Sequence, residues 1–269
     1  MARRRGVPRA WIGVVALAAT AIVVCRERGS RERSASAQPD APAYYQAEVA
    51  EHPGAAIVVL VDTSGSMGEV VPRDSRPKFQ VAREALKDVL AATDEFARRR
   101  PGYPIDIAIF GFSGLPWEVL PMRPYDREAV TAALDRLPRP GGGTAIGAAL
   151  QAARVALYRS GDIRKYILAV TDGQNTVGSA PDLVARDIFA KSRGGVSISF
   201  VAFDTNPAAF GFLRDVGGDV AAAQDGPALQ AALRRIYEGK ILAEAEPGGA
   251  APSGSAGEQP AAPSNGRTR

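Results

Sequence analysis

Three short stretches of the chain are almost entirely apolar, and each ends at an aspartate. Residues 55–62 read AAIVVLVD, residues 165–172 read KYILAVTD, and residues 196–204 read VSISFVAFD. Apolar runs of this length are typical of strands that are buried on both faces. Such strands occur in mainly parallel sheets that are covered by helices on both sides.

The segments between these strands carry helical periodicity. Residues 78–99, for example, place Ala82, Leu86, Val89 and Phe96 at helical spacing. Further helices are expected over residues 126–137, 144–159, 181–193, 207–216 and 226–242, with a hairpin at 105–112 and 117–122 and a short edge strand at 219–223. The pattern predicts an α/β fold: a doubly wound, mainly parallel sheet with one antiparallel edge strand and helices on both faces.

Charge and composition exclude several classes of function. The net charge of +4 arises in residues 1–33, which hold eight Arg and two Glu; the remaining 25 basic and 27 acidic residues give −2. This balance does not indicate a nucleic-acid surface. The chain has one cysteine, Cys25, and one histidine, His52, which lies outside the regular pattern. A thiolate zinc site and most histidine-based catalysis are therefore excluded.

The two ends of the chain differ in composition from its middle. Residues 1–9 are basic, and residues 10–25 form a charge-free apolar run whose helix would span about 24 Å, against about 30 Å of hydrocarbon. We interpret this run as a signal anchor; a cleaved signal peptide with the sequence ASA at 35–37 is the alternative. A lipoprotein at Cys25 is less well supported because Val24 is bulky.

These features predict the organisation of the whole chain. Residues 26–53 are expected to be a linker, residues 54–243 a domain, and residues 244–269, rich in Pro, Gly and Ala, a disordered tail. With the anchor retained, the domain would lie outside the cytoplasm on a single-pass membrane protein; with cleavage, it would be secreted or periplasmic.

Polar side chains gather where the apolar strands end. The first strand runs into Asp62, Ser64 and Ser66; Thr144 follows a run of three glycines; and Asp172 ends the second strand. Because ligands bind beyond the carboxyl ends of the strands in such sheets, these three loops could converge there. Hydroxyl and carboxylate oxygens suit a hard divalent cation such as Mg²⁺.

This set of residues resembles the von Willebrand factor A-type domains that carry a metal-ion-dependent adhesion site. The family motif is Asp-x-Ser-x-Ser, with a Thr from a second loop and an Asp from a third; it is matched by Asp62, Ser64, Ser66, Thr144 and Asp172. The TDG sequence at 171–173 also fits. The resemblance covers residues 54–243.

The resemblance implies a ligand set. It implies direct coordination of Mg²⁺, with Mn²⁺ or Ca²⁺ as alternatives, by Ser64, Ser66 and often Thr144. Asp62 and Asp172 would act through water or alternate between direct and indirect contact. A carboxylate of the partner would complete the octahedron.

The same residues could also have purely structural roles. The Asp62–Ser66 stretch could be a turn with a helix cap, Thr144 a cap of the following helix, and Asp172 part of an Asp-Gly turn. Position 145, often Asp or polar in the family, is Ala here. We expect Asp204 to serve a turn or cap a helix.

We therefore expect a metal-dependent protein-binding module that captures an exposed Asp or Glu of its partner, with contacts from residues 67–77, 111–118 and 173–180. The alternative is a scaffold subunit of a membrane or chelatase-like assembly, with a mainly structural metal. Enzymatic activity and a small-molecule substrate are not expected. The GFSG sequence at 111–114 lacks the second glycine of a nucleophile elbow, and no glycine-rich phosphate loop is present.

Overall fold

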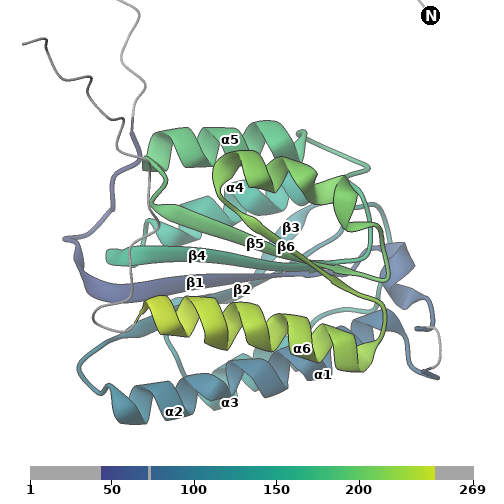
Figure 1. The fold of residues 1–269 in the computed structure, drawn as a ribbon, viewed down its shortest axis with the longest axis horizontal. Coiled ribbons are helices and arrows are strands. Elements are labelled where there is room, and N and C mark those ends of the chain that lie inside the picture. Colours follow the sequence, from purple (N-terminus) through teal and green to yellow (C-terminus); the bar gives the residue numbers. More distant parts are fainter. Residues whose placement is uncertain (1–43, 72–73, 246–269) are drawn as a thin grey trace, which may run out of the picture. The chain divides into compact units, whose positions relative to one another are not determined.

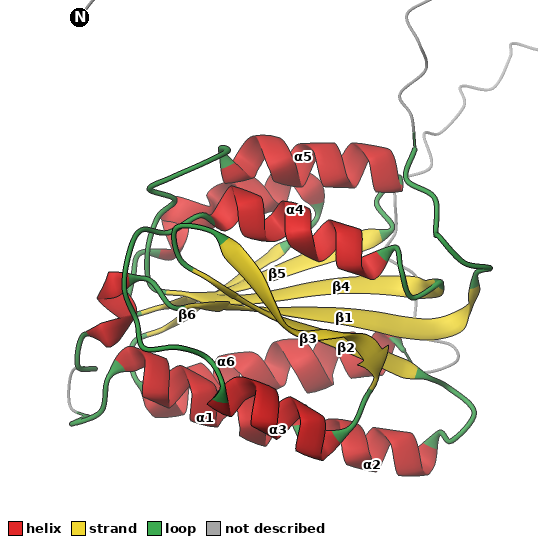
Figure 2. Ribbon diagram, turned by 180° about the vertical axis from the view of Figure 1, so that it is seen from behind, coloured by secondary structure: helices red, strands yellow, loops and turns green. Residues whose placement is uncertain are grey.

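The computed structural model describes residues 44–71 and 74–245, which form one sheet between two layers of helices (Figure 1, Figure 2). The sheet has six strands in the order β3-β2-β1-β4-β5-β6. They are β1 (His52–Asp62), β2 (Ile105–Phe112), β3 (Pro116–Pro124), β4 (Asp162–Thr171), β5 (Val196–Phe203) and β6 (Asp219–Ala223). Only the β2–β3 pair is antiparallel among the described strands. The predicted fold class, with its antiparallel edge strand, is confirmed.

Helices cover both faces of this sheet (Figure 2). One face carries α1 (Lys78–Leu90), α2 (Ala92–Arg99), α3 (Arg127–Asp135) and α6 (Gly226–Ile236). The other face carries α4 (Ile146–Leu157) and α5 (Pro181–Ser192). Asp126 caps α3 by accepting a hydrogen bond from the Ala129 N–H, and Pro181 opens α5.

The central strand β1 explains why its sequence is apolar throughout. Residues 55–61 are fully buried. Ile57, Val59 and Val61 pack into the core under α1 and α6, whereas Val58 and Leu60 pack into the core under α4 and α5. Because successive side chains of a strand point to opposite faces, a strand between two helical layers has no position for a polar residue.

The order of the strands changes direction at β1 and β4. The chain moves from β1 outward to β2 and β3, and then returns to β4 on the other side of β1. The connections therefore leave β1 and β4 in opposite directions. At such a reversal the loops after the strands separate, which opens a binding crevice beyond the carboxyl ends.

Several elements differ in detail from the prediction. The helix expected over 78–99 is divided at Ala91 into α1 and α2. The helix expected over 226–242 continues from α6 as a π-helix, η3 (Tyr237–Leu242), and η2 (Pro207–Val216) is a 3₁₀-helix. In η3 the Tyr237 side chain is fully buried, and its hydroxyl lies 2.6 Å from Thr93 Oγ1.

Regular structure and packing continue beyond residues 54 and 243 at the two ends of the domain. His52, expected outside the regular pattern, is the first residue of β1 and pairs with Asp162 of β4. Because His52 lies outside the apolar run, the apolar pattern does not mark it as part of the strand. At the other end, the Tyr166 hydroxyl donates to Glu244, and Ala245 is buried, so packing extends two residues past 243.

Parts of the predicted organisation lie outside the described residues. These are the basic start, the apolar run 10–25, linker residues 26–43 and tail residues 246–269. Within residues 44–71 and 74–245, none of the helices has the length and apolar character needed to cross a membrane. In the described part of the linker, Tyr45 packs against Tyr158, and its hydroxyl donates to Asp187.

Candidate functional site

The predicted site residues come together at the carboxyl edge of the sheet. Asp62 is the last residue of β1, and Asp172 directly follows β4, the strand paired with β1. Thr144 lies in the loop before α4. Asp62, Ser64, Thr144 and Asp172 are buried, and Ser66 is half-buried. The strand order, together with the loop before α4, thus brings carboxylates and hydroxyls from distant parts of the chain to one place.

The first loop turns around the carboxylate of Asp62. One oxygen accepts a hydrogen bond from the Ser64 N–H at 2.7 Å, and the other accepts one from the Thr171 hydroxyl at 2.5 Å. The hydroxyl oxygens of Ser64 and Ser66 lie 3.3 Å apart. After this turn the chain enters η1 (Gly65–Gly68). Asp62 therefore both shapes the loop and brings negative charge beside two hydroxyls.

The second and third loops meet the first through backbone and side-chain contacts. The Gly65 N–H donates to the carbonyl of Gly142 at 3.1 Å, and the Ser66 hydroxyl donates to Asp172 Oδ1 at 2.7 Å. A Cβ built on Gly173 would lie 3.6 Å from Thr144 Oγ1 and 3.8 Å from Ser66 Oγ. Both hydroxyls thus border the same small space, and glycine at 173 keeps that space open.

Thr144 is not a simple cap of the helix that follows it. Helix α4 begins at Ile146, with Ala145 in the cap position and no side-chain cap bond. The Thr144 N–H instead donates to Thr176 Oγ1 at 2.8 Å, and the Thr176 N–H donates back to the Thr144 carbonyl. This reciprocal pair fixes the second loop against the third and leaves the Thr144 hydroxyl facing Gly173.

Burial makes the negative charge of the site costly to maintain. Loss of solvent raises the pKa of Asp62 to about 6, although hydrogen bonds from Thr171 and Ser64 oppose that rise. A nearby cation would relieve this cost because it favours the ionised carboxylate. Two carboxylates and three hydroxyls form an all-oxygen set, the chemistry that Mg²⁺, Mn²⁺ and Ca²⁺ prefer. The donor set therefore fits a divalent cation.

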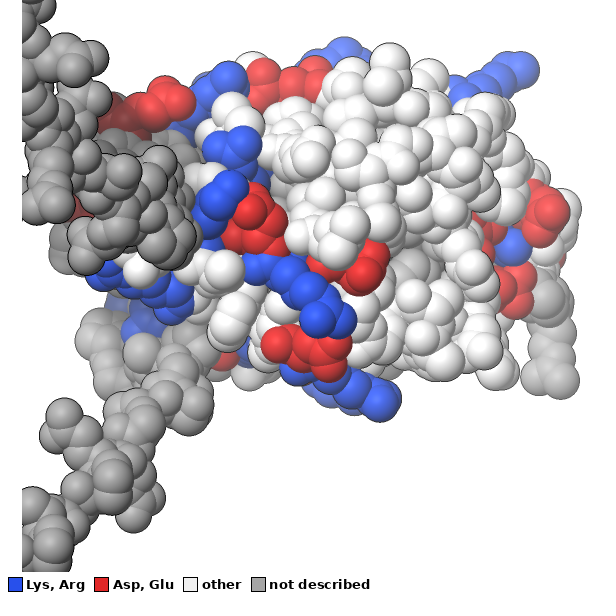
Figure 3. Space-filling model, turned by 90° about the horizontal axis from the view of Figure 1, so that it is seen from above, with Lys and Arg blue, Asp and Glu red and all other residues white. Residues whose placement is uncertain are grey.

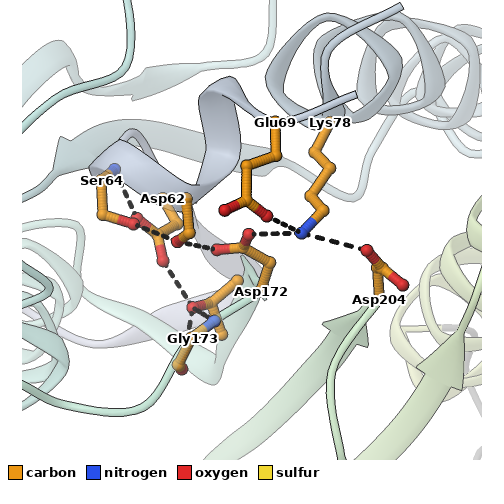
Figure 4. A network of polar contacts seen from close by, with 9 residues as sticks. Asp62, Ser64, Glu69, Lys78, Asp172, Gly173 and Asp204 are labelled. Carbon is orange, nitrogen blue, oxygen red and sulfur yellow. Dashed lines mark hydrogen bonds and ion pairs between the residues drawn. The ribbon is translucent and has the colours of Figure 1, made fainter. Parts of the chain in front are cut away.

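Sequence reasoning missed a lysine at this edge. Figure 4 shows the Lys78 ammonium between the carboxylates of Glu69, Asp172 and Asp204. The signal was present in the sequence, because Lys78 lies four residues before Ala82, on the apolar stripe of the predicted helix. A lysine on a buried stripe needs carboxylate partners.

The role expected for Asp204 is only partly right. It lies in the turn after β5 with a positive φ of 50°, and its N–H donates to the Ala223 carbonyl at 2.6 Å. It does not cap the following helix, because Asn206 caps η2 by accepting from the Ala208 N–H. Its carboxylate instead contacts Lys78 at 3.0 Å.

The surface around the site has two contrasting sides. Residues 140–153, 173–181 and 205–213 contain no charged side chain, and Figure 3 shows a broad uncharged area on the face of α4 and α5. A pocket of about 380 Å³ lies on this side, lined by Ile146, Gln174, Asn175, Pro181, Asp182, Ala209, Phe210 and Phe212. Glu69, Asp204 and Lys78 mark the charged side. In the part of the chain that the structure describes, no three His, Cys, Asp or Glu side chains form a metal cluster.

Part of the chain matches the model of a known family. Residues 57–174 match the family model of the von Willebrand factor type A domain. This match confirms the resemblance to this type of domain that the motif indicated. It spans Asp62, Ser64, Ser66, Thr144 and Asp172. No curated protein sequence matches the chain.

Solved structures share the fold at low sequence identity. The PilB minor pilin from Streptococcus sanguinis is 14% identical, with a TM-score of 0.58, over 72% of this chain and 63% of the pilin. The SpaC pilus adhesin from Lactobacillus rhamnosus GG is 15% identical, with a TM-score of 0.56, over 75% of this chain and 32% of the adhesin. A von Willebrand factor type A protein from Catenulispora acidiphila is 22% identical, with a TM-score of 0.54, over 71% and 43%. The chain thus spans less than two thirds of each of these proteins.

Proposed function

We propose that this chain, which contains a von Willebrand factor type A domain, binds a protein partner through a divalent cation held at the carboxyl edge of its sheet. The observation that carries the proposal is the convergence of Ser64, Ser66 and Thr144 with Asp62 and Asp172 in three interlocked loops. The pilus proteins among the structural neighbours support a role in protein binding.

The hydroxyl residues and the carboxylate residues would have different roles in holding the ion. The hydroxyls of Ser64, Ser66 and Thr144 would supply neutral oxygen ligands, and Asp62 and Asp172 would supply the charge. Mg²⁺ is the proposed ion; when bound, it offers a position that accepts a carboxylate. Two carboxylates balance the charge of a dication, so an Asp or Glu of the partner meets no surplus of negative charge from this pair.

The rim loops would supply the rest of the contact. Val70, Leu115 and Val177 are exposed apolar side chains in the three loops 67–77, 111–118 and 173–180. The uncharged side of the rim suits an apolar partner surface around the acidic residue. Membrane attachment through residues 10–25, with the domain outside the cytoplasm, is part of the same proposal.

We propose a binding protein rather than an enzyme. The hydroxyls of Ser64 and Ser66 lie at the carboxyl end of β1, whereas His52, the one histidine of the chain, begins that strand about 30 Å away. Among the described residues, these hydroxyls therefore have no histidine near enough to serve as a general base.

The experiment is affinity capture with the full chain in detergent, in Mg²⁺ and in EDTA. Three proteins are compared: wild type, Asp62→Asn, and the matched control Asp162→Asn at the opposite end of the sheet. We expect wild type and the control to retain a partner only in Mg²⁺, and Asp62→Asn to retain none. Equal retention in every condition would reject metal-mediated capture. A stable complex that survives EDTA would support the scaffold alternative.

A further inference from the structure

Lys78 is an almost fully buried cation at the edge of the proposed metal site. It is the first residue of α1 and is 4% exposed. Its Nζ lies 3.0 Å from Glu69 Oε2, 3.1 Å from Asp172 Oδ2 and 3.0 Å from Asp204 Oδ2 (Figure 4). These carboxylates come from the segment after η1, the loop after β4 and the turn after β5. One ammonium thus joins three segments that are far apart in the sequence.

Asp172 divides its two oxygens between Lys78 and the hydroxyl cluster. Oδ2 accepts from the Lys78 ammonium, and Oδ1 accepts from the Ser66 hydroxyl at 2.7 Å. The ammonium therefore lies on the side of the carboxylate away from Ser66 and does not fill the space among the hydroxyls. Lys78 and a divalent ion would act on the same carboxylate from different oxygens.

Lys78 carries a fixed charge. Its ammonium contacts the carboxylates of Asp204, Glu69 and Asp172 within 3.1 Å, and opposite charges at this distance favour the ionised form. Among described residues, Lys165 is the other buried lysine, and it lies at the opposite end of the sheet. Burial lowers the pKa of Lys165, against weaker opposing effects of Glu51 and Asp162. The contrast shows how closely the carboxylates surround Lys78.

We propose that Lys78 is a built-in counter-charge of the metal site, which keeps the site assembled without metal and lowers its affinity for a divalent cation. This inference rests on the proposed metal-dependent function. The permanent positive charge of Lys78 beside Asp172 reduces the attraction of that carboxylate for a second cation. The ammonium and the divalent cation also repel each other strongly, because the site is partly buried. The same charge prevents repulsion among Glu69, Asp172 and Asp204 when no ion is bound.

A purely structural role makes the opposite prediction for metal binding. If Lys78 only clamped the loops, its removal would loosen Asp172 and leave the metal affinity unchanged or weaker. If Lys78 acts as a counter-charge, its removal strengthens metal binding although it destabilises the metal-free protein. The sign of the change in affinity therefore separates the two roles.

The test is isothermal titration of Mn²⁺ into the full chain in detergent, at pH 7.5. Lys78→Met removes the charge, Lys78→Arg keeps it, and Lys165→Met removes an equally buried charge at the other end of the sheet. We expect the Kd for Mn²⁺ to fall about tenfold in Lys78→Met. It should stay within about threefold of wild type in the two controls. Lys78→Gln, which keeps hydrogen-bonding capacity, replaces Lys78→Met if the latter does not fold.

Thermal unfolding gives a second readout. Lys78→Met should have a lower Tm than wild type in EDTA and a larger rise in Tm on addition of Mn²⁺, because tighter binding to the folded state stabilises it more. A folded Lys78→Met or Lys78→Gln protein with an unchanged or higher Kd would overturn the counter-charge role alone. Absence of Mn²⁺ binding in wild type and in every Lys78 variant would instead overturn the proposed function, and this inference with it.

Discussion

Asp62 and Asp162 are both fully buried at opposite ends of the paired strands β1 and β4, but their surroundings differ. Asp62 accepts hydrogen bonds on both oxygens and borders a cluster of hydroxyls. Neither oxygen of Asp162 accepts a hydrogen bond from the described residues; His52 Nδ1 lies 3.4 Å from one of them. The carboxyl end of the sheet is thus organised around its buried charge, and the amino end is not.

The two carboxyls nevertheless have similar proton affinities. Burial raises the pKa of each to about 6, with Asp106 adding to the effect at Asp162. At the carboxyl end, a cation among polar oxygens would relieve the cost of the buried charge. At the amino end, a proton or the charge of His52 would do so. A raised carboxyl pKa therefore does not by itself indicate a binding site. The hydrogen-bond donors and oxygen ligands around the carboxyl distinguish the two ends.

The same substitution at both ends gives the largest expected contrast. Asp62→Asn removes one charge from the proposed site without changing its size, and we expect Mg²⁺ affinity to fall about 100-fold because hard cations depend on anionic oxygens. Asp162→Asn should leave that affinity unchanged. Isothermal titration of the two variants provides the measurement. Equal losses of affinity would mean that the two ends do not differ as described.

Glycines at the two ends should respond differently to an added methyl group. A Cβ at Gly54 would lie 1.9 Å from Asp162 Oδ1, so Gly54→Ala should lower the free energy of unfolding by about 1–3 kcal/mol. A Cβ at Gly173 makes only ordinary contacts with Thr144 and Ser66, so Gly173→Ala should fold normally and weaken Mg²⁺ binding. Denaturant unfolding and metal titration measure the two effects.

The Gly54 clash has an internal control. Asp162→Ala removes the oxygen that the new methyl group meets. The double variant should therefore recover much of the stability that Gly54→Ala loses. If Gly54→Ala is destabilised to the same extent with and without Asp162, another contact, such as that with Pro104, causes the loss.

Asp162→Asn should stabilise the protein at neutral pH. A carboxyl whose pKa is raised from 3.8 to about 6 on folding is stabilising when protonated, and its contribution is lost as pH rises through that window. With screening by solvent, we expect a gain of about 1–2 kcal/mol at pH 7 and none at pH 3.5. Urea unfolding at both pH values tests this. A gain that is equal at the two pH values would show that ionisation is not the cause.

His52→Gln gives the smallest effect. The His52 side chain is 46% exposed, and its charge lowers the pKa of Asp162. Exposed pairs contribute little, so we expect a loss of about 0.5 kcal/mol at low salt and a smaller loss in 1 M salt, which screens the pair. Urea unfolding of wild type and variant at the two salt concentrations provides the comparison. An equal loss at both would indicate packing rather than charge.

The sequence predicted the organised end of the sheet far better than the other end. Asp62 and Asp172 were identifiable because each directly follows an apolar strand, and strand ends share an edge in a parallel sheet. Asp162 carries no such signal. Its burial arises because β1 extends back to His52 and pairs with it there, beyond the apolar run that marked the strand.

Lys78 illustrates a second limit. Its place on the apolar stripe of a helix shows that it needs a partner, but its partners Asp172 and Asp204 are supplied by loops 94 and 126 residues further along the chain. Asp204 was assigned to a turn for the same reason. Local pattern identifies residues at the ends of regular elements, whereas contacts between loops depend on the packed fold.

The most direct test of the proposed cation site is a crystal structure of the protein soaked in Mn²⁺, examined by anomalous scattering. We predict one strong peak bordered by the side-chain oxygens of Ser64, Ser66 and Thr144. The ion pair between Lys78 and Asp172 should remain in place. No peak among these oxygens at saturating Mn²⁺, or a peak that is found only elsewhere on the molecule, would contradict the account.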